Sequence, residues 1–85
     1  MKILTTHYIE DNGKTFHEGH DIALDYRKGK TVVHVIGNIE RIVCDALYLS
    51  DCTIFEPGEN PRQERILVLL VSDMIADSAD YVFTD

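Results

Sequence analysis

The sequence predicts an all-β fold, a small and strongly bent barrel of five to six strands with a short helical turn near the C-terminus. Residues 30–55 predict one long strand bent at Gly37, a reversal around Asp45 and a second strand that runs back. Polar turns separate the other apolar segments, and no window of a dozen residues keeps the 3.6-residue period of a helix. A glycine inside a strand pattern marks a bulge or bend, which a small barrel needs because one strand must serve two sheets.

The residues before this ribbon are expected to form strands joined by tight turns. Residues 2–10 predict a first strand, and Asn12-Gly13 is typical of a type I′ hairpin turn, which needs positive φ at both central positions. A second turn is expected over residues 17–20. Asp21 to Arg27 alternates apolar and charged residues, so it predicts a half-buried strand, and Gly29 is expected to take positive φ in the next turn.

The residues after the ribbon begin with a predicted loop. Residues 56–61 hold two prolines, a glycine and an asparagine, and the loop is expected to continue through Gln63. Ile66 to Val71 is apolar without alternation, and its six-residue length and β-branched content favour a strand over the alternative, a helix from Arg62 to Ile75.

The C-terminal part predicts a turn and a final strand. Residues 72–77 are typical of a short helical turn, with Ser72 or Asp73 as its N-terminal cap. Tyr81 to Phe83 is expected to form the last strand. The chain has 85 residues with no internal repeat and no low-complexity segment, so residues 1–85 are expected to form a single domain.

The charge and the apolar pattern exclude several partner classes. The net charge is −7, from 15 acidic and 8 basic residues, and the basic residues are scattered, so nucleic acid is not an expected partner. The longest apolar run, Ile66 to Val71, is far shorter than the roughly 20 residues of a membrane-spanning helix, so no membrane partner is expected. The N-terminus has no long apolar core, and we expect no signal peptide.

The two cysteines, Cys44 and Cys52, are fewer than a secreted, disulfide-held mini-domain usually carries. We therefore expect a cytoplasmic protein with two free, largely buried thiols.

The order of these signals carries a family resemblance. Gly19 to Lys30 resembles the strand and turn that open the Sm motif, and Gly37-Asn38-Ile39 resembles the bent strand of that motif. Over residues 19–71 the pattern is similar to that of the small SH3-like barrels, the Sm-like group among them. The resemblance implies a barrel and a ring-like oligomer.

The RNA-binding residues of the Sm-like group are not present at the matching positions. The Sm pattern carries Met-Asn three and four residues after an aspartate, where they form a base-binding pocket, but Tyr48 and Leu49 follow Asp45 here. The Arg-Gly that ends the second Sm motif is replaced by Ser72-Asp73. The resemblance therefore implies a fold and an assembly, and it does not imply RNA binding.

Candidate catalytic and metal-binding residues are sparse. His17 and His20 are weak candidates for a zinc or nickel site, since their spacing of three with a glycine between them suits a solvated turn better than a helical metal motif. Asp21 and Asp25 would lie about 13 Å apart along a strand, too far for a coupled acid–base pair. We expect no cofactor, no bound metal and no enzymatic activity.

The leading functional hypothesis is a non-enzymatic binding or assembly module that self-associates as a homo-oligomer, with a protein partner as a further option. A strand that is apolar on both sides suggests that its outer side packs on another chain or under a terminal segment. The expected partner-binding residues are Ile66, Val68, Leu70, Tyr81 and Phe83.

The alternative is an acidic inhibitor or modulator that occupies a basic site on a nucleic-acid-handling protein, as small phage-encoded proteins do. Exposed carboxylates would carry that function by attraction to the basic site. The expected acidic surface consists of Glu56, Glu59, Asp73, Asp77 and Asp80.

Overall fold

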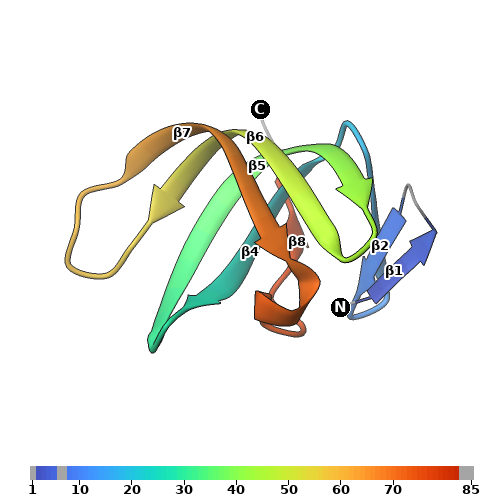
Figure 1. The fold of residues 1–85 in the computed structure, drawn as a ribbon, viewed down its shortest axis with the longest axis horizontal. Helices are drawn as coiled ribbons and strands as arrows, with labels where there is room; N and C mark the ends of the chain where they lie inside the picture. The colour runs from blue at the N-terminus through green and yellow to red at the C-terminus, as the bar shows by residue number, and fades with distance from the viewer. Residues whose placement is uncertain (1, 6–7, 83–85) are drawn as a thin grey trace.

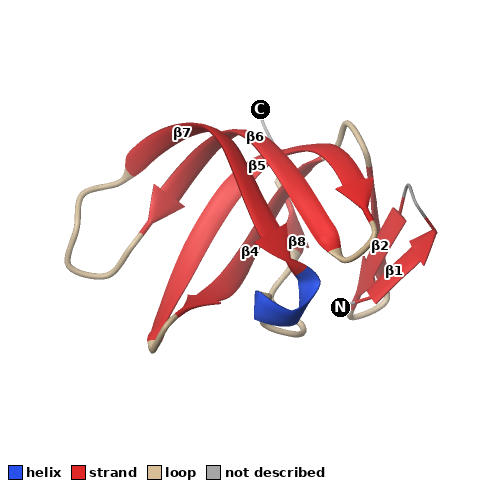
Figure 2. Cartoon of the chain, viewed as in Figure 1, coloured by secondary structure: helices blue, strands red, loops and turns tan. Residues whose placement is uncertain are grey.

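The computed structural model describes residues 2–5 and 8–82, with side chains from residue 8 onward. The described chain is all-β, with strands and one 3-10 turn and no α-helix (Figures 1 and 2). A three-stranded sheet in the order β1-β2-β3 lies beside a five-stranded sheet in the order β7-β6-β5-β4-β8. None of the described residues form a helix that could cross a membrane.

The strands of the smaller sheet are β1 (Lys2–Thr5), β2 (Tyr8–Asp11) and β3 (Lys14–His17). The larger sheet consists of β4 (Asp21–Lys28), β5 (Thr31–Val43), β6 (Ala46–Phe55), β7 (Arg62–Leu70) and β8 (Asp80–Tyr81), with the 3-10 turn η1 (Val71–Asp73) after β7. All neighbouring strands are antiparallel.

The predicted tight turns are confirmed. Asn12 and Gly13 have φ of 52° and 77° between the paired residues Asp11 and Lys14, as a type I′ turn requires. Gly29 has φ of 64° in the turn after β4. The reversal near Asp45 is also confirmed.

The prediction of one strand over residues 2–10 is wrong, because the chain folds back within it. Ile3 pairs with Ile9 and Thr5 with Tyr8, so the segment supplies two antiparallel strands. The hairpin pairs the backbone N–H and C=O groups of each half with the other half.

The bend in the long ribbon comes from two β-bulges on opposite strands. Ile36 pairs with Thr53 and Asn38 with Ser50, so Gly37 of β5 faces two residues of β6, and Asp51 has φ of 51°. A second shift lies between Ile39 and Arg41, where β5 has the extra residue. These bulges change which side chains face inward, and they increase the local twist.

The C-terminal segment departs from the sequence-based expectations at three points. The loop ends at Pro61, since Arg62 and Gln63 already belong to β7 and pair with residues of β6. The alternative prediction, a helix from Arg62 to Ile75, is wrong. The helical turn starts earlier, at Val71, and its N-cap is Leu70 with no side-chain capping bond. The last strand is β8, and Phe83 lies outside the described residues.

One hydrophobic core extends across both sheets. Ile9 and Phe16 of the smaller sheet belong to the same cluster as the inward side chains of the larger sheet. The fully buried aliphatic members of the larger sheet are Ile22, Leu24, Val33, Val35, Ile39, Leu47, Leu49 and Ile54.

Asp11 ties the C-terminal segment to the smaller sheet. Its carboxylate is 1% exposed and accepts hydrogen bonds from the backbone N–H groups of Asp77 and Ala79, both at 2.9 Å. Tyr81 adds a second connection, since its hydroxyl donates to the backbone oxygen of Thr15 at 3.2 Å and its ring lies 4.9 Å from that of Phe16.

Candidate functional site

The outer side of β7 exposes three large apolar side chains. Ile66, Val68 and Leu70 are 48%, 49% and 51% exposed, and we call these three residues the β7 surface. The side chains between them face inward, with Leu69 buried and Leu67 half-buried against the core. The unbroken apolar run of the sequence therefore follows the ordinary alternation of a strand, and within the described chain only one of its two faces is covered.

The β7 surface continues across the neighbouring strands. Val68 pairs with Tyr48 and Leu70 with Ala46 on β6, and directly paired residues share a face of the sheet. Val43 of β5, which pairs with Ala46, is 39% exposed. The outer face of the sheet is therefore apolar over three strands near the end of β7.

No described strand pairs with the outer side of the backbone of the β7 surface. The N–H of Val71 donates to the carbonyl of Asp45 at 2.8 Å, and this bond shows which β7 residues direct their backbone groups toward β6. Backbone groups of successive residues point alternately toward and away from the partner strand, so the N–H and C=O groups of Ile66, Val68 and Leu70 point away from β6. No strand follows β7 in the described sheet, so this edge can accept an added strand.

The opposite edge of the larger sheet is the two-residue strand β8, and the chain itself covers the length of β4 beyond it. Beyond β8, the outer backbone of β4 meets the segment after η1: the N–H of Ile75 donates to the carbonyl of Asp25 at 2.9 Å, and Met74 forms a bridge with Tyr26. The N–H of Asp25 donates to the hydroxyl of Ser78 at 3.0 Å. These contacts leave no length of β4 comparable to β7 for an added strand.

The other residues expected to bind a partner lie elsewhere in the sheet. Tyr81 is on β8, which is not a neighbour of β7, and its ring packs against Phe16. Tyr81 is still 39% exposed, but its contacts connect the two sheets of one chain. Phe83 lies outside the described residues.

Several residues of the expected acidic surface are paired with cations. Lys28 donates to Glu56 at 3.1 Å, and this hydrogen bond is the main reason that the pKa of Glu56 is lowered. Lys14 donates a hydrogen bond to the carboxylate of Asp80 at 2.9 Å, and this bond is the main reason that the pKa of Asp80 is lowered. Glu59 lies 3.7 Å from Arg62. Asp73 and Asp77 are exposed at the turns after β7.

The three described histidines are in contact with other protein groups. His17 and His20 lie with ring centroids 4.8 Å apart in the turn before β4, and the N–H of His17 donates to Nδ1 of His20 at 3.4 Å. His34 contacts a carboxylate of β4 instead, with its Nδ1 2.6 Å from Asp25. Among residues 8–82, no three His, Cys, Asp or Glu side chains gather as a metal site would require.

The two cysteines have different environments, and the expectation that both are largely buried is wrong for Cys44. Cys44 is exposed with φ of 52° in the β5–β6 turn, because a two-residue hairpin turn leaves no neighbour to cover its side chain. Cys52 is fully buried beside Gly37, and burial raises the pKa of its thiol to about 11.

We expect a thiol reagent at pH 8 to modify one cysteine per folded chain and two per unfolded chain. The thiolate is the reactive form, and a pKa of about 11 leaves on the order of 0.1% of Cys52 ionised at that pH. The absorbance of an aromatic disulfide reagent measures both phases. In Cys44→Ser the fast phase should disappear, and equal rates for the two cysteines in the wild type would contradict this assignment.

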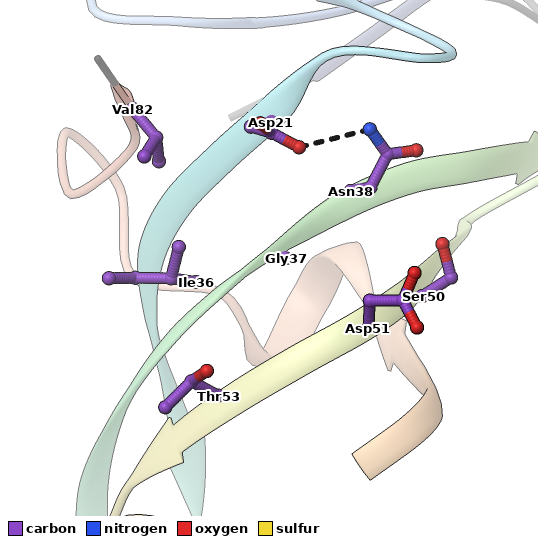
Figure 3. Close-up of a pocket in the computed structure, with 8 residues that line it drawn as sticks. All are labelled: Asp21, Ile36, Gly37, Asn38, Ser50, Asp51, Thr53 and Val82. Atoms are coloured by element: carbon purple, nitrogen blue, oxygen red, sulfur yellow. Dashed lines mark hydrogen bonds between the residues drawn. The ribbon is translucent and has the colours of Figure 1, made fainter. Parts of the chain in front are cut away.

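A shallow pocket of about 370 Å³ lies at the first bulge (Figure 3). Gly37 is among its lining residues, and Asn38 donates to Asp21 across its rim at 3.0 Å. Asp51, placed here by the bulge, adds a second carboxylate. The full lining is Asp21, Ile36, Gly37, Asn38, Ser50, Asp51, Thr53 and Val82.

The pocket lining offers carboxylate, amide and hydroxyl oxygens and no Lys, Arg, His or Cys side chain. Such oxygens accept hydrogen bonds from a polar or cationic group, and the lining has no nucleophile with a neighbouring base. Sequence reasoning did not find this pocket, because a bulge that involves Asp51 is set by the pairing of two strands. The glycine within the strand pattern was the available signal.

No family model, curated protein sequence or solved structure matches this chain.

Proposed function

We propose that this protein is a non-enzymatic assembly module that self-associates through the β7 surface. The observation that carries the proposal is that Ile66, Val68 and Leu70 are each about half exposed on a strand whose outer backbone groups pair with no other described strand. Water-exposed apolar side chains favour burial, and an exposed edge strand favours the addition of another strand. The two preferences coincide on the same three residues.

We further propose that the larger sheet is an SH3-like barrel of the Sm-like kind. Its support is the strand order, in which β8 follows η1 and returns to pair with β4, the first strand of this sheet. The two bulges in the β5–β6 ribbon supply the strong bend that such a barrel needs. The size of the chain supports the proposed self-association, since a domain of 85 residues buries a limited core and gains stability by association.

Substituting Val68 with lysine is expected to weaken self-association at least about tenfold, because burial of the side chain at an interface would then bury an unpaired charge. Val32→Lys is the matched control, since Val32 is 44% exposed on β5 away from the β7 surface, and it should leave association unchanged. Light scattering behind a sizing column, across a concentration series, measures the molar mass. A wild-type protein that stays at 9.7 kDa throughout the micromolar range would contradict the proposal.

A further inference from the structure

We propose that two copies of this chain pair through β7 of each copy, antiparallel, about a two-fold axis at Val68. This inference rests on the proposed self-association and specifies its partner, its symmetry and its register. The contact would extend each five-stranded sheet into a continuous sheet of ten strands.

The available edges favour a second copy in a two-fold arrangement. A head-to-tail assembly within this sheet would need β7 of one copy to pair with the opposite edge of the next. That edge consists of the two-residue strand β8 and of the length of β4 beyond it, against nine residues in β7. Met74, Ile75 and Ser78 already occupy that edge of β4 through backbone and hydroxyl contacts. Within the described larger sheet, β7 is therefore the long open edge, and when it meets an identical edge the contact between identical patches closes as a two-fold pair.

The pattern of side chains along β7 selects the register. Only the even-numbered residues direct their backbone groups outward, so an added antiparallel β7 must place even-numbered residues opposite even-numbered residues. An axis at Val68 pairs Val68 with itself and Ile66 with Leu70, so all six exposed apolar side chains meet one another. An axis two residues earlier, at Ile66, would instead place Glu64 opposite Val68 and Arg62 opposite Leu70. Apolar cross-strand pairs therefore favour the axis at Val68.

The charge of Arg65, near the start of β7, is complementary to the acidic end of that strand in this arrangement. Arg65, near the start of β7, is exposed and has no ion pair among the described residues. Asp73 and Asp45 lie at the other end of β7, and both are exposed. An antiparallel pair brings Arg65 of each strand toward the acidic end of the other, and the two-fold axis makes this contact twice.

Cysteine scanning along β7 tests both the strand and the register. Single cysteines at positions 64, 66, 68 and 70 are placed in a Cys44→Ser background, where the remaining Cys52 is fully buried. At a rise of about 3.4 Å per residue, the two copies of position 68 lie about 5 Å apart, those of 66 or 70 about 14 Å, and those of 64 about 28 Å. Lys30→Cys, in the exposed β4–β5 turn, is the control for random collisions.

Mild oxidation followed by a non-reducing gel measures the rate at which the disulfide-linked dimer forms. We expect Val68→Cys to cross-link at least about tenfold faster than Ile66→Cys and Leu70→Cys, because a disulfide needs Cα atoms within about 7 Å. Ile66→Cys and Leu70→Cys should have similar rates, and Glu64→Cys and Lys30→Cys should stay at the background rate. The half-exposed sites lie outside the core, so these variants should fold.

The outcomes separate the two proposals. A wild-type oligomer in solution whose cross-linking rate peaks away from position 68, or shows no peak, overturns the two-fold register and leaves self-association standing. A wild-type monomer overturns both the register and the proposed function. A dimer with its cross-linking maximum at Val68 supports both.

Discussion

Replacing Asp11 with alanine is expected to lower the free energy of unfolding by about 3–5 kcal/mol, because it removes two hydrogen bonds to a buried carboxylate. The N–H groups of Asp77 and Ala79 would lose their acceptor, and Ala79 is itself buried. The segment between η1 and β8 would then lose its attachment to the smaller sheet. Urea denaturation followed by circular dichroism measures the change.

Two variants control for this interpretation. Asp11→Asn keeps one acceptor oxygen but turns an amide N–H group toward a backbone donor, so its cost should lie between those of the wild type and the alanine variant. Asp73→Ala removes an exposed carboxylate and should change stability by less than about 0.5 kcal/mol. If Asp11→Ala were as stable as Asp73→Ala, Asp11 would not be the attachment point.

Substituting Gly37 with alanine is expected to cost about 1–3 kcal/mol through overpacking. A Cβ at this position would lie 3.0 Å from Sγ of Cys52 and 3.4 Å from Cβ of Leu49. Both neighbours are buried, so neither can move away without disturbing the core. The φ of Gly37 is not among the positive values of the described residues, so the cost is steric rather than conformational.

A double-mutant cycle with Cys52→Ala tests this reason directly. Removing Sγ creates space for the added methyl group, so the double variant should be more stable than the sum of the two single changes predicts, by at least about 0.5 kcal/mol. Thermal unfolding of the four proteins gives the coupling. If the stability losses of the two single variants simply added in the double variant, a clash with Sγ of Cys52 would not be the reason for the cost at Gly37.

The sequence by itself determined the fold class and the local reversals. Asn12-Gly13 specifies its turn because both residues tolerate positive φ, and the alternation of Ile22, Leu24 and Tyr26 specifies one buried face of β4, as the structure has it. Each of these signals lies within a few residues, where backbone sterics and side-chain period act directly. The sequence also indicated the apolar β7 surface, since the apolar run of that strand is longer than one buried face needs.

Only the tertiary structure decided which contacts join distant parts of the chain. Asp11 meets Asp77 across 66 positions of sequence, and no local pattern marks an aspartate after a strand as the acceptor for a remote turn. The closeness of Gly37 to Cys52 and the pocket beside Asp51 arise from a bulge, which depends on how two strands are paired. The unpaired edge of β7 likewise follows from strand order, because a strand's sequence shows which face is apolar but not which neighbours complete its hydrogen bonds.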